Sequence, residues 1–369
     1  MQLTNIIIQK IKLNGPISFH DFMEMALYYP ELGYYTSKGE KIGTEGDFYT
    51  SSDLSPVFGA MVAKQLEEIW QIMGTKTFTV VEYGAGNGSL CENILNYFKK
   101  DIKLFENFYY CIIEKSQSLR DKQKIHLNGN IRWVDKIQDL DEIEGCVISN
   151  ELVDNFAVHL VEMHEELMEI FIDYQTNKFI EILKPASDKL KNYLDELKVT
   201  LPNGFRTEIN LEAIGWLQDI AQSLNKGYII TIDYGFTSDE LYSDRRRQGT
   251  LLCYNKHQIN DDVYNDIGKQ DITAHVNFSA LSYWGQKAGL DYCGFTNQAN
   301  FLLALGFKDY FRNINTNGKN IMQMALEETR ITRTLLLDLG LKIKVLVQKK
   351  GVRENSLTGL KHPEKLISA

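Results

Sequence analysis

"VVEYGAGNGSL", residues 80–90, joins an apolar run to a helix-like segment through a loop with glycines at positions 84, 86 and 88. The residues before the loop, FTVVEY, predict a strand, and the residues after it, SLCENILNYFKK, predict an amphipathic helix. Further apolar strands are predicted at FYYCIIEK (108–115), IRWVD (131–135), GCVISNE (145–151) and YIITIDYG (228–235). Apolar strands that alternate with helices predict an α/β fold with a doubly wound parallel sheet.

The glycine loop differs from the dinucleotide fingerprint G-x-G-x-x-G. Gly84 and Gly86 match it, but Ser89 occupies the third position and the last glycine, Gly88, comes one residue early. In dinucleotide-binding folds the last glycine allows close packing behind a pyrophosphate at the helix N-terminus. We therefore expect a loop that brings backbone close to a ligand without the same phosphate site.

Acidic residues follow the predicted strands. Glu82 lies two residues before the first glycine, where it would repel a pyrophosphate but suit an ammonium group. Glu114, at the end of the second strand, is placed to accept both ribose hydroxyls of an adenosine, and Asp135 could accept the adenine amino group. An adenosine with a cationic amino-acid end describes S-adenosyl-L-methionine. Glu82 and the missing third-position glycine disfavour a nicotinamide dinucleotide.

The fourth predicted strand ends in SNELVDNF, which supplies Asn150, Glu151 and Asp154. Two carboxylates three residues apart, at the carboxyl edge of the sheet, suit a guanidinium held by forked hydrogen bonds. The alternative is a helix N-terminus that carries favourable acids. We expect these residues to contact the methyl acceptor.

A second polar group lies in QDITAHVNF, where alternation would place Asp271, Thr273, His275 and Asn277 on one strand face. His275 could act as a general base or belong to a hydrogen-bonded brace. His257 precedes it, but no cluster of ligands accompanies the two histidines. We expect no metal.

The rest of the chain predicts additions to the sheet domain. Residues 1–75 predict a helical cap that includes a Gly- and Tyr-rich functional loop at 33–53. Residues 76–350 form the expected methyltransferase domain, with a β-rich insertion at 156–208 and a long active-site segment at 235–276. We expect a helix to end at Gly227. We expect KIKVLVQKK (342–350) to form the last strand and residues 351–369 to form a tail.

Composition restricts the function class. A formal net charge of -9 argues against broad nucleic-acid binding, and no run is apolar and long enough for a membrane span. The five cysteines show no C-x-x-C spacing, and Cys111 and Cys146 lie inside apolar runs as expected for core residues. Together with the absence of a transit-peptide bias, they favour a reducing cytoplasm. A homodimer is left open.

Six segments occur in an order that resembles the MidA family of class I S-adenosyl-L-methionine-dependent methyltransferases. They are GDFYTSSDLSPVFG, VVEYGAGNGSL, SNELVDNFAVHLVE, IDYG, QGTLLCYNKH and QDITAHVNFSAL. The resemblance implies a Rossmann-like seven-stranded sheet with an antiparallel last strand and an N-terminal helical cap. Its mitochondrial members are protein-arginine methyltransferases that act during complex I assembly.

The resemblance also implies site residues. The glycine loop and Glu114 would bind the cofactor, and Asp47, Thr50 and Ser51 would fold over the site. The chain departs from the family pattern after Asp154, which leaves the acceptor less constrained than the cofactor.

The resulting hypothesis is a methyltransferase that uses S-adenosyl-L-methionine to modify an arginine side chain of a protein substrate. Two alternatives stay open. One is a methyltransferase for a small molecule or another side chain, and the other is an assembly factor that binds the cofactor but works by holding a partner protein.

Overall fold

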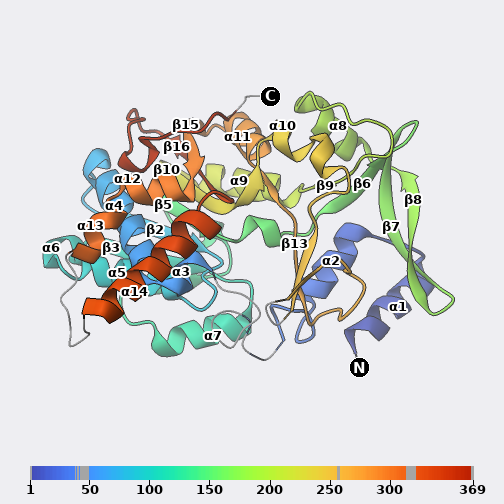
Figure 1. Ribbon diagram of the computed structural model, residues 1–369, viewed down its shortest axis with the longest axis horizontal. Coiled ribbons are helices and arrows are strands. Elements are labelled where there is room, and N and C mark those ends of the chain that lie inside the picture. Colours follow the sequence, from blue (N-terminus) through green and yellow to red (C-terminus); the bar gives the residue numbers. More distant parts are fainter. Residues whose placement is uncertain are drawn as a thin grey trace.

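The computed structural model describes residues 2–37, 39, 41, 50–255, 258–312 and 321–366. A central mixed sheet lies among helices, and two smaller sheets lie beside it (Figure 1). The helices are α1 (Leu3–Asn14), α2 (Phe19–Tyr28), α3 (Ser51–Leu54), α4 (Pro56–Met73), α5 (Ser89–Phe98), α6 (Ile102–Glu106), α7 (Gln117–His126), α8 (Asp188–Glu196), α9 (Glu212–Ser223), α10 (Ser238–Leu241), α11 (Phe278–Lys287), α12 (Gln298–Ala304), α13 (Phe307–Arg312) and α14 (Ile321–Thr332).

The central sheet confirms the predicted α/β fold and its seven-stranded order. In space its strands run β15 (Asp291–Asn297), β16 (Ile343–Lys350), β10 (Leu224–Phe236), β5 (Ile143–Asn150), β2 (Phe78–Tyr83), β3 (Phe108–Ile113) and β4 (Ile131–Val134). The strands from β10 to β4 are parallel, whereas β16 is antiparallel to both of its neighbours. A two-residue strand, β14 (Val276–Asn277), adds to the end of β10.

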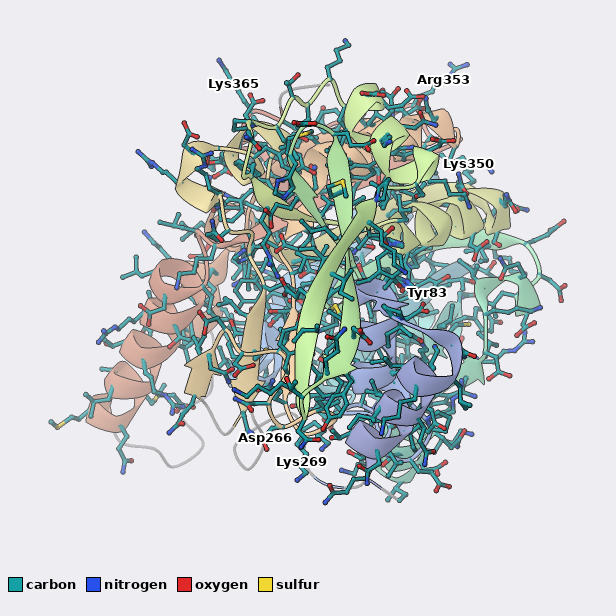
Figure 2. The ribbon with its side chains drawn as sticks, turned by 90° about the vertical axis from the view of Figure 1, so that its right-hand side faces the viewer. Tyr83, Asp266, Lys269, Lys350, Arg353 and Lys365 are labelled. Carbon is teal, nitrogen blue, oxygen red and sulfur yellow. The ribbon has the colours of Figure 1, made fainter. Side chains whose placement is uncertain are left out.

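The parallel strands all end at one edge of the sheet, and this edge carries the site. Lys350 pairs with Gly227 near the beginning of β10, so it marks the opposite edge. Tyr83 ends β2 and marks the carboxyl edge, well separated from Lys350 in the side view (Figure 2).

Helices cover both faces of the central sheet because its strands are apolar on both sides. Buried side chains of α4, α5 and α12 form one core with Val80 and Ile148, and those of α9 and α11 form the other with Val81 and Val147. The boundaries of α4 follow capping rules. Ser55 accepts the Val57 N–H at the start, and Gly74 ends the helix in a left-handed conformation.

The predicted β-rich insertion at 156–208 is antiparallel, as expected, but it also contains helix α8. Its strands are β6 (His159–Met163), β7 (Leu167–Gln175), β8 (Lys178–Pro185) and β9 (Arg206–Ile209). The N-terminal strand β1 (Ile17–Ser18) pairs with β7, and α1 and α2 lie beside this sheet (Figure 1). Buried side chains of both helices share a core with it. The predicted N-terminal cap is therefore divided, because α4 packs on the central sheet instead.

The segment 235–276 is long and polar, as predicted, and it forms the second of the two smaller sheets. Its strands are β11 (Leu252–Asn255), β12 (Gln258–Asn260) and β13 (Asp271–Thr273). The prediction that Asp271, Thr273, His275 and Asn277 share one strand is wrong, because the chain leaves β13 after Thr273. Asn277 instead accepts the Ala280 N–H and caps α11.

The predicted end of a helix at Gly227 is also wrong. Helix α9 ends at Ser223, and Gly227 lies inside β10 with φ +148°. A Cβ at this position would meet the carbonyl oxygen of Gly145 at 1.9 Å, so glycine permits the close approach of β10 and β5. In the described part of the chain no helix combines the length and apolar character that crossing a bilayer requires.

Candidate active site

A cavity of about 490 Å³ opens at the carboxyl ends of β2, β3 and β5. The glycine loop forms its floor, with Gly84 at φ +66° and Gly86 at φ +57°. Residues with a side chain rarely adopt these backbone angles. Glycine therefore lets the loop turn sharply and expose backbone to the cavity. The cavity also contains Glu82, Glu114 and Asp135, so the acids predicted for the cofactor come together.

Glu82 and Glu114 are both buried. Glu82 accepts a hydrogen bond from the Tyr110 hydroxyl at 2.8 Å, and burial raises the pKa of its carboxyl to about 8. The Oε1 atom of Glu114 accepts the Ser116 N–H at 2.9 Å, and its Oε2 atom accepts the Gly86 N–H at 3.3 Å. Burial raises the pKa of Glu114, while these hydrogen bonds oppose the rise. Each carboxylate oxygen can accept further bonds, so Glu114 suits a diol.

Asp135 lies at the rim of the cavity. Its side chain is 82% exposed and forms an ion pair with Arg120 at 2.7 Å. Arg120 also donates to the carbonyl oxygens of Glu114 and Val134. This arginine ties the ends of β3 and β4 together and holds Asp135 beside the cavity.

Thr50 lines the cavity, whereas Ser51 and Gly88, which were predicted to contact the cofactor, do not. Gly88 starts α5 at φ +88°, and a Cβ there would meet Leu127 at 3.0 Å, so it packs toward the end of α7. The Ser51 N–H instead donates to Glu151 Oε1 at 2.7 Å, which brings the N-terminal segment onto the acceptor side. Asp47 and His257 lie outside the described residues.

A second cavity of about 290 Å³ adjoins the first, and Glu151 and Asn155 line both. Its described lining residues are Leu54, Glu151, Asp154, Asn155, Tyr234, Tyr254, Ile259, Asp271, Thr273, Ala274, His275, Thr334 and Leu339. No lysine or arginine occurs among these described residues. The second cavity is therefore aromatic and acidic.

Two of the predicted acceptor residues, Glu151 and Asp154, line the second cavity, and both are desolvated. Burial raises the pKa of Glu151 to about 8, opposed by the hydrogen bond from Ser51. Burial and the negative charges of Asp233 and Asp271 raise the pKa of Asp154 well above its usual range. In the described structure the Oδ1 atom of Asp154 has no hydrogen-bond partner. Carboxylates removed from water without a cation are costly, so a cationic ligand bound here would offset that cost.

The other two predicted acceptor residues are placed differently. Asn150 lines the first cavity, where its Oδ1 atom has no partner among the described groups, so it faces the cofactor side. His275 lines the second cavity, and burial together with the charge of Arg246 lowers its pKa to about 4. Its ring is neutral at pH 7, and its Nδ1 atom has no described partner.

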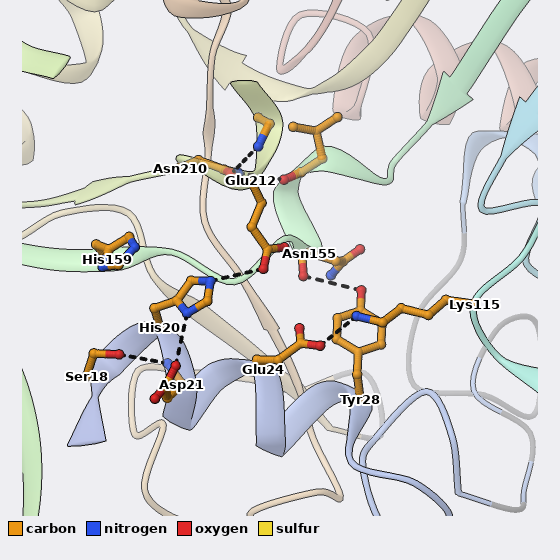
Figure 3. Close-up of polar contacts among 12 residues, drawn as sticks. Ser18, His20, Asp21, Glu24, Tyr28, Lys115, Asn155, His159, Asn210 and Glu212 are labelled. Carbon is orange, nitrogen blue, oxygen red and sulfur yellow. Dashed lines mark hydrogen bonds and ion pairs between the residues drawn. The ribbon is translucent and has the colours of Figure 1, made fainter. Parts of the chain in front are cut away.

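Sequence reasoning missed the contribution of the N-terminal helix α2 to the first cavity. Tyr28 of α2 lines this cavity and donates to the Asn155 carbonyl at 3.3 Å (Figure 3). Lys115 pairs with Glu24 at 2.6 Å and lies 3.9 Å above the Tyr28 ring. Figure 3 also shows a third link, from His20 of α2 to Glu212 at the start of α9, at 3.0 Å.

The other missed residues are aromatic or lie far along the chain. Tyr35 and Trp216 line the first cavity together with Tyr28 and Glu212. Tyr35 falls in the loop that was predicted to be functional, so the concentration of tyrosines there was a usable signal. Trp216 and Glu212 belong to an ordinary amphipathic helix, and no local pattern distinguishes them. Among the described residues, no group of three or more His, Cys, Asp or Glu side chains is placed to hold a metal ion.

Comparisons with known proteins agree with this geometry. The model of a family of S-adenosyl-L-methionine-dependent methyltransferases matches residues 61–296. A solved structure of a COG1565 superfamily member from Burkholderia thailandensis, bound to S-adenosyl-homocysteine, is 30% identical. It has a TM-score of 0.89, with 98% of this chain and 95% of that chain covered. A native structure of a COG1565 superfamily protein from the same organism has a TM-score of 0.86 at 29% identity, over 98% of this chain and 95% of that chain.

Curated relatives are named protein arginine methyltransferase NDUFAF7 or its homologue, mitochondrial. The Caenorhabditis elegans protein is 25% identical, with 93% of this chain and 85% of the relative covered. The human protein is 26% identical, with 76% of this chain and 68% of the relative covered.

The mitochondrial names of these relatives contradict the predicted cytoplasmic location. That prediction relied on unpaired cysteines and on the absence of a transit-peptide bias, and the five cysteines are free in the structure. Free thiols indicate a reducing environment but do not identify the compartment. The family assignment has firmer support, because the model match, the shared fold and the cavity at the glycine loop all agree. The chain belongs to the MidA family of S-adenosyl-L-methionine-dependent methyltransferases.

Proposed function

We propose that this methyltransferase acts on a guanidinium nitrogen of an arginine side chain in a protein substrate. The observation that carries the proposal is the second cavity, whose wall contains the buried carboxylate of Asp154 and the partly buried carboxylate of Glu151. Because Glu151 also lines the first cavity, a cation bound there would lie next to the cofactor. The curated relatives support this choice of acceptor, since they are named protein arginine methyltransferases.

The first cavity fits S-adenosyl-L-methionine, which when bound supplies a methyl group on a positively charged sulfur. In the proposed arrangement Glu114 accepts the ribose hydroxyls and Asp135 accepts the adenine amino group. Glu82 and Asn150 face the amino-acid end, where the unpartnered Asn150 Oδ1 atom can accept an N–H. The solved relative with S-adenosyl-homocysteine supports the same ligand class.

The acceptor is held by charge and geometry. Asp154 offers an unpartnered oxygen to the guanidinium, and Glu151 offers a second carboxylate three residues earlier. Glu151 has φ +51°, an uncommon angle for a residue with a side chain, and its N–H donates to the Ile232 carbonyl at 2.8 Å. Backbone held in such a conformation at a site often fixes a functional side chain.

A proton must leave the guanidinium once it is methylated. Burial raises the pKa of Glu151 to about 8, so its ionised form is a stronger base than an ordinary carboxylate and can accept that proton. His275 lines the same cavity, but its pKa of about 4 makes the ring a weak base, so Glu151 is the better proton acceptor. Asp154 and Glu151 also exclude water from the cation by direct contact.

The test is transfer of labelled methyl groups from S-adenosyl-L-methionine into protein of a cell extract, followed by mass spectrometry of the labelled residue. Labelled arginine supports the proposal, and Glu151→Gln should reduce transfer at least tenfold, since one charge-assisted hydrogen bond contributes about 1.5–3 kcal/mol. The matched control is Glu165→Gln, which changes an exposed residue of the β6–β7 turn.

The same experiment separates the alternatives. Label in a different side chain, or only in small molecules, would replace arginine as the acceptor. Cofactor binding without any transfer would favour a role as an assembly factor.

A further inference from the structure

Asp233 is a fully buried carboxylate behind the loop that carries the acceptor residues, and it lines neither cavity. Its Oδ2 atom accepts the Leu152 N–H at 3.0 Å and the Val153 N–H at 2.7 Å. Its Oδ1 atom accepts the Tyr234 N–H at 2.8 Å. One side chain thus satisfies three backbone donors.

The two loop donors are the only residues between Glu151 and Asp154. The parallel pairing of β5 with β10 ends at Asn150 and Ile232, one residue before Glu151 and Asp233. The loop leaves the sheet at this point, and the Asp233 carboxylate accepts hydrogen bonds that the strand ladder no longer supplies. It therefore fixes the backbone from which both acceptor carboxylates project.

We propose that Asp233 is the positioning residue of the acceptor site. It holds the carboxylates of Glu151 and Asp154 where both can contact the cation that they bind. This inference rests on the proposed function. Asparagine could not replace it, because its single amide oxygen accepts fewer N–H groups and its NH₂ would face a donor. Burial raises the pKa of Asp233 to about 7, so above that pH it also adds a negative charge behind the cation, which strengthens the field in the second cavity.

The charged and titratable groups around the two acceptor carboxylates come from four elements. Asp53 of α3 and Asp233 of β10 act on Glu151, and Asp271 of β13 acts on Asp154. The charge of Asp233 raises the pKa of both acceptor carboxyls. The hydroxyls of Tyr234 and Tyr254 face the same carboxylates from β10 and β11. Removal of the Asp233 charge should therefore lower the pKa of Glu151.

The test compares Asp233→Asn with Asp173→Asn. Asp173 is a matched control because it accepts the N–H of the following tyrosine, Tyr174, at 2.8 Å, in an identical Asp-Tyr pair on β7. Calorimetry measures binding of S-adenosyl-homocysteine, and labelled methyl transfer into extract protein measures activity from pH 6 to 9.5. We expect Asp233→Asn to bind S-adenosyl-homocysteine within twofold of wild type and to transfer methyl groups at least tenfold more slowly. The acidic limb of its pH–rate profile should move to lower pH by roughly half a unit. The Asp173→Asn control should match wild type.

A second variant distinguishes loss of positioning from loss of folding. Asp233→Glu keeps the charge but lengthens the side chain, so it should keep the wild-type acidic limb and still transfer slowly. Wild-type transfer rates in either variant that binds S-adenosyl-homocysteine overturn the inference. So does loss of S-adenosyl-homocysteine binding in both variants, which would make Asp233 a support of the whole fold. A wild-type protein that labels no extract protein refutes the proposed function instead, and that failure is separate.

Discussion

Replacing Asp154 by asparagine should slow methyl transfer strongly while leaving cofactor binding intact. Asp154 lines the second cavity and not the first, and its buried Oδ1 atom has no described hydrogen-bond partner, so a guanidinium could supply the missing donor. The amide keeps the shape of the side chain but loses the charge. One charge-assisted hydrogen bond contributes about 1.5–3 kcal/mol, which corresponds to roughly a 10- to 100-fold lower kcat/KM for the acceptor.

The pH dependence of this variant is a sharper test than its rate. Burial and the charges of Asp233, Asp271 and Glu151 raise the pKa of Asp154 well above its usual range, so deprotonation of this carboxyl moves to higher pH. Binding of a guanidinium requires the carboxylate. We therefore expect kcat/KM to rise with pH in the wild type and to rise less steeply in Asp154→Asn.

The assay is initial-rate transfer of labelled methyl groups at several pH values, with calorimetry of S-adenosyl-homocysteine as the measure of cofactor binding. Asp195→Asn, an exposed change on α8, is the control and should behave as wild type. Equal pH profiles for wild type and Asp154→Asn would refute the reasoning, even if both rates fell. A tenfold loss of S-adenosyl-homocysteine affinity would show that the two cavities are not separate in function.

Three further predictions concern the cofactor and the fold. Glu114→Gln should weaken S-adenosyl-homocysteine binding about 10- to 100-fold in calorimetry, because an amide has one acceptor oxygen where the carboxylate has two; unchanged affinity would remove Glu114 from the ribose site. Hydrogen bonds to Asp21 and Glu212 raise the pKa of His20 to about 9. Protonated His20 therefore stabilises the folded protein by about 2 kcal/mol after allowance for solvent. This contribution is complete below pH 6.5 and is lost as pH rises through 9. Urea unfolding of His20→Gln should differ from wild type at pH 6 but not at pH 10, and an equal difference at both would contradict the ion pairs. Gly145→Ala places a Cβ 2.0 Å from the Thr79 carbonyl oxygen and should cost at least about 2 kcal/mol, whereas Gly215→Ala in α9 meets nothing within 4 Å and should stabilise by up to about 1 kcal/mol in thermal unfolding.

The sequence predicted that the acids at the strand ends would meet, because the relevant information is local. Apolar strands separated by amphipathic helices specify a parallel sheet, and parallel strands end at one edge. Acids at the ends of strands must then meet there, which is why Glu82, Glu114 and Asp135 surround one cavity. The same logic placed Glu151 and Asp154 near that edge.

Errors arose where a residue type has more than one use. Glycine ends helices, but Gly227 lies in β10 because two backbones approach closely there. Gly88 lies against Leu127 at the end of α7 and does not line the first cavity. Alternation in QDITAHVNF predicts one strand, yet the chain turns after Thr273, since Asn277 is needed to cap α11.

By itself the sequence determined the central sheet, the glycine loop and the acids at its edge, because these follow from periodicity and from the direction of parallel strands. Only the tertiary structure decided that Glu151 belongs to two cavities and that α2 supplies Tyr28 to the first. It also decided that Asp233 holds the backbone of Leu152 from a strand 81 residues away. Such contacts join elements distant in the chain, and their partners leave no local pattern, since packing and hydrogen bonding select them only once the sheet has formed.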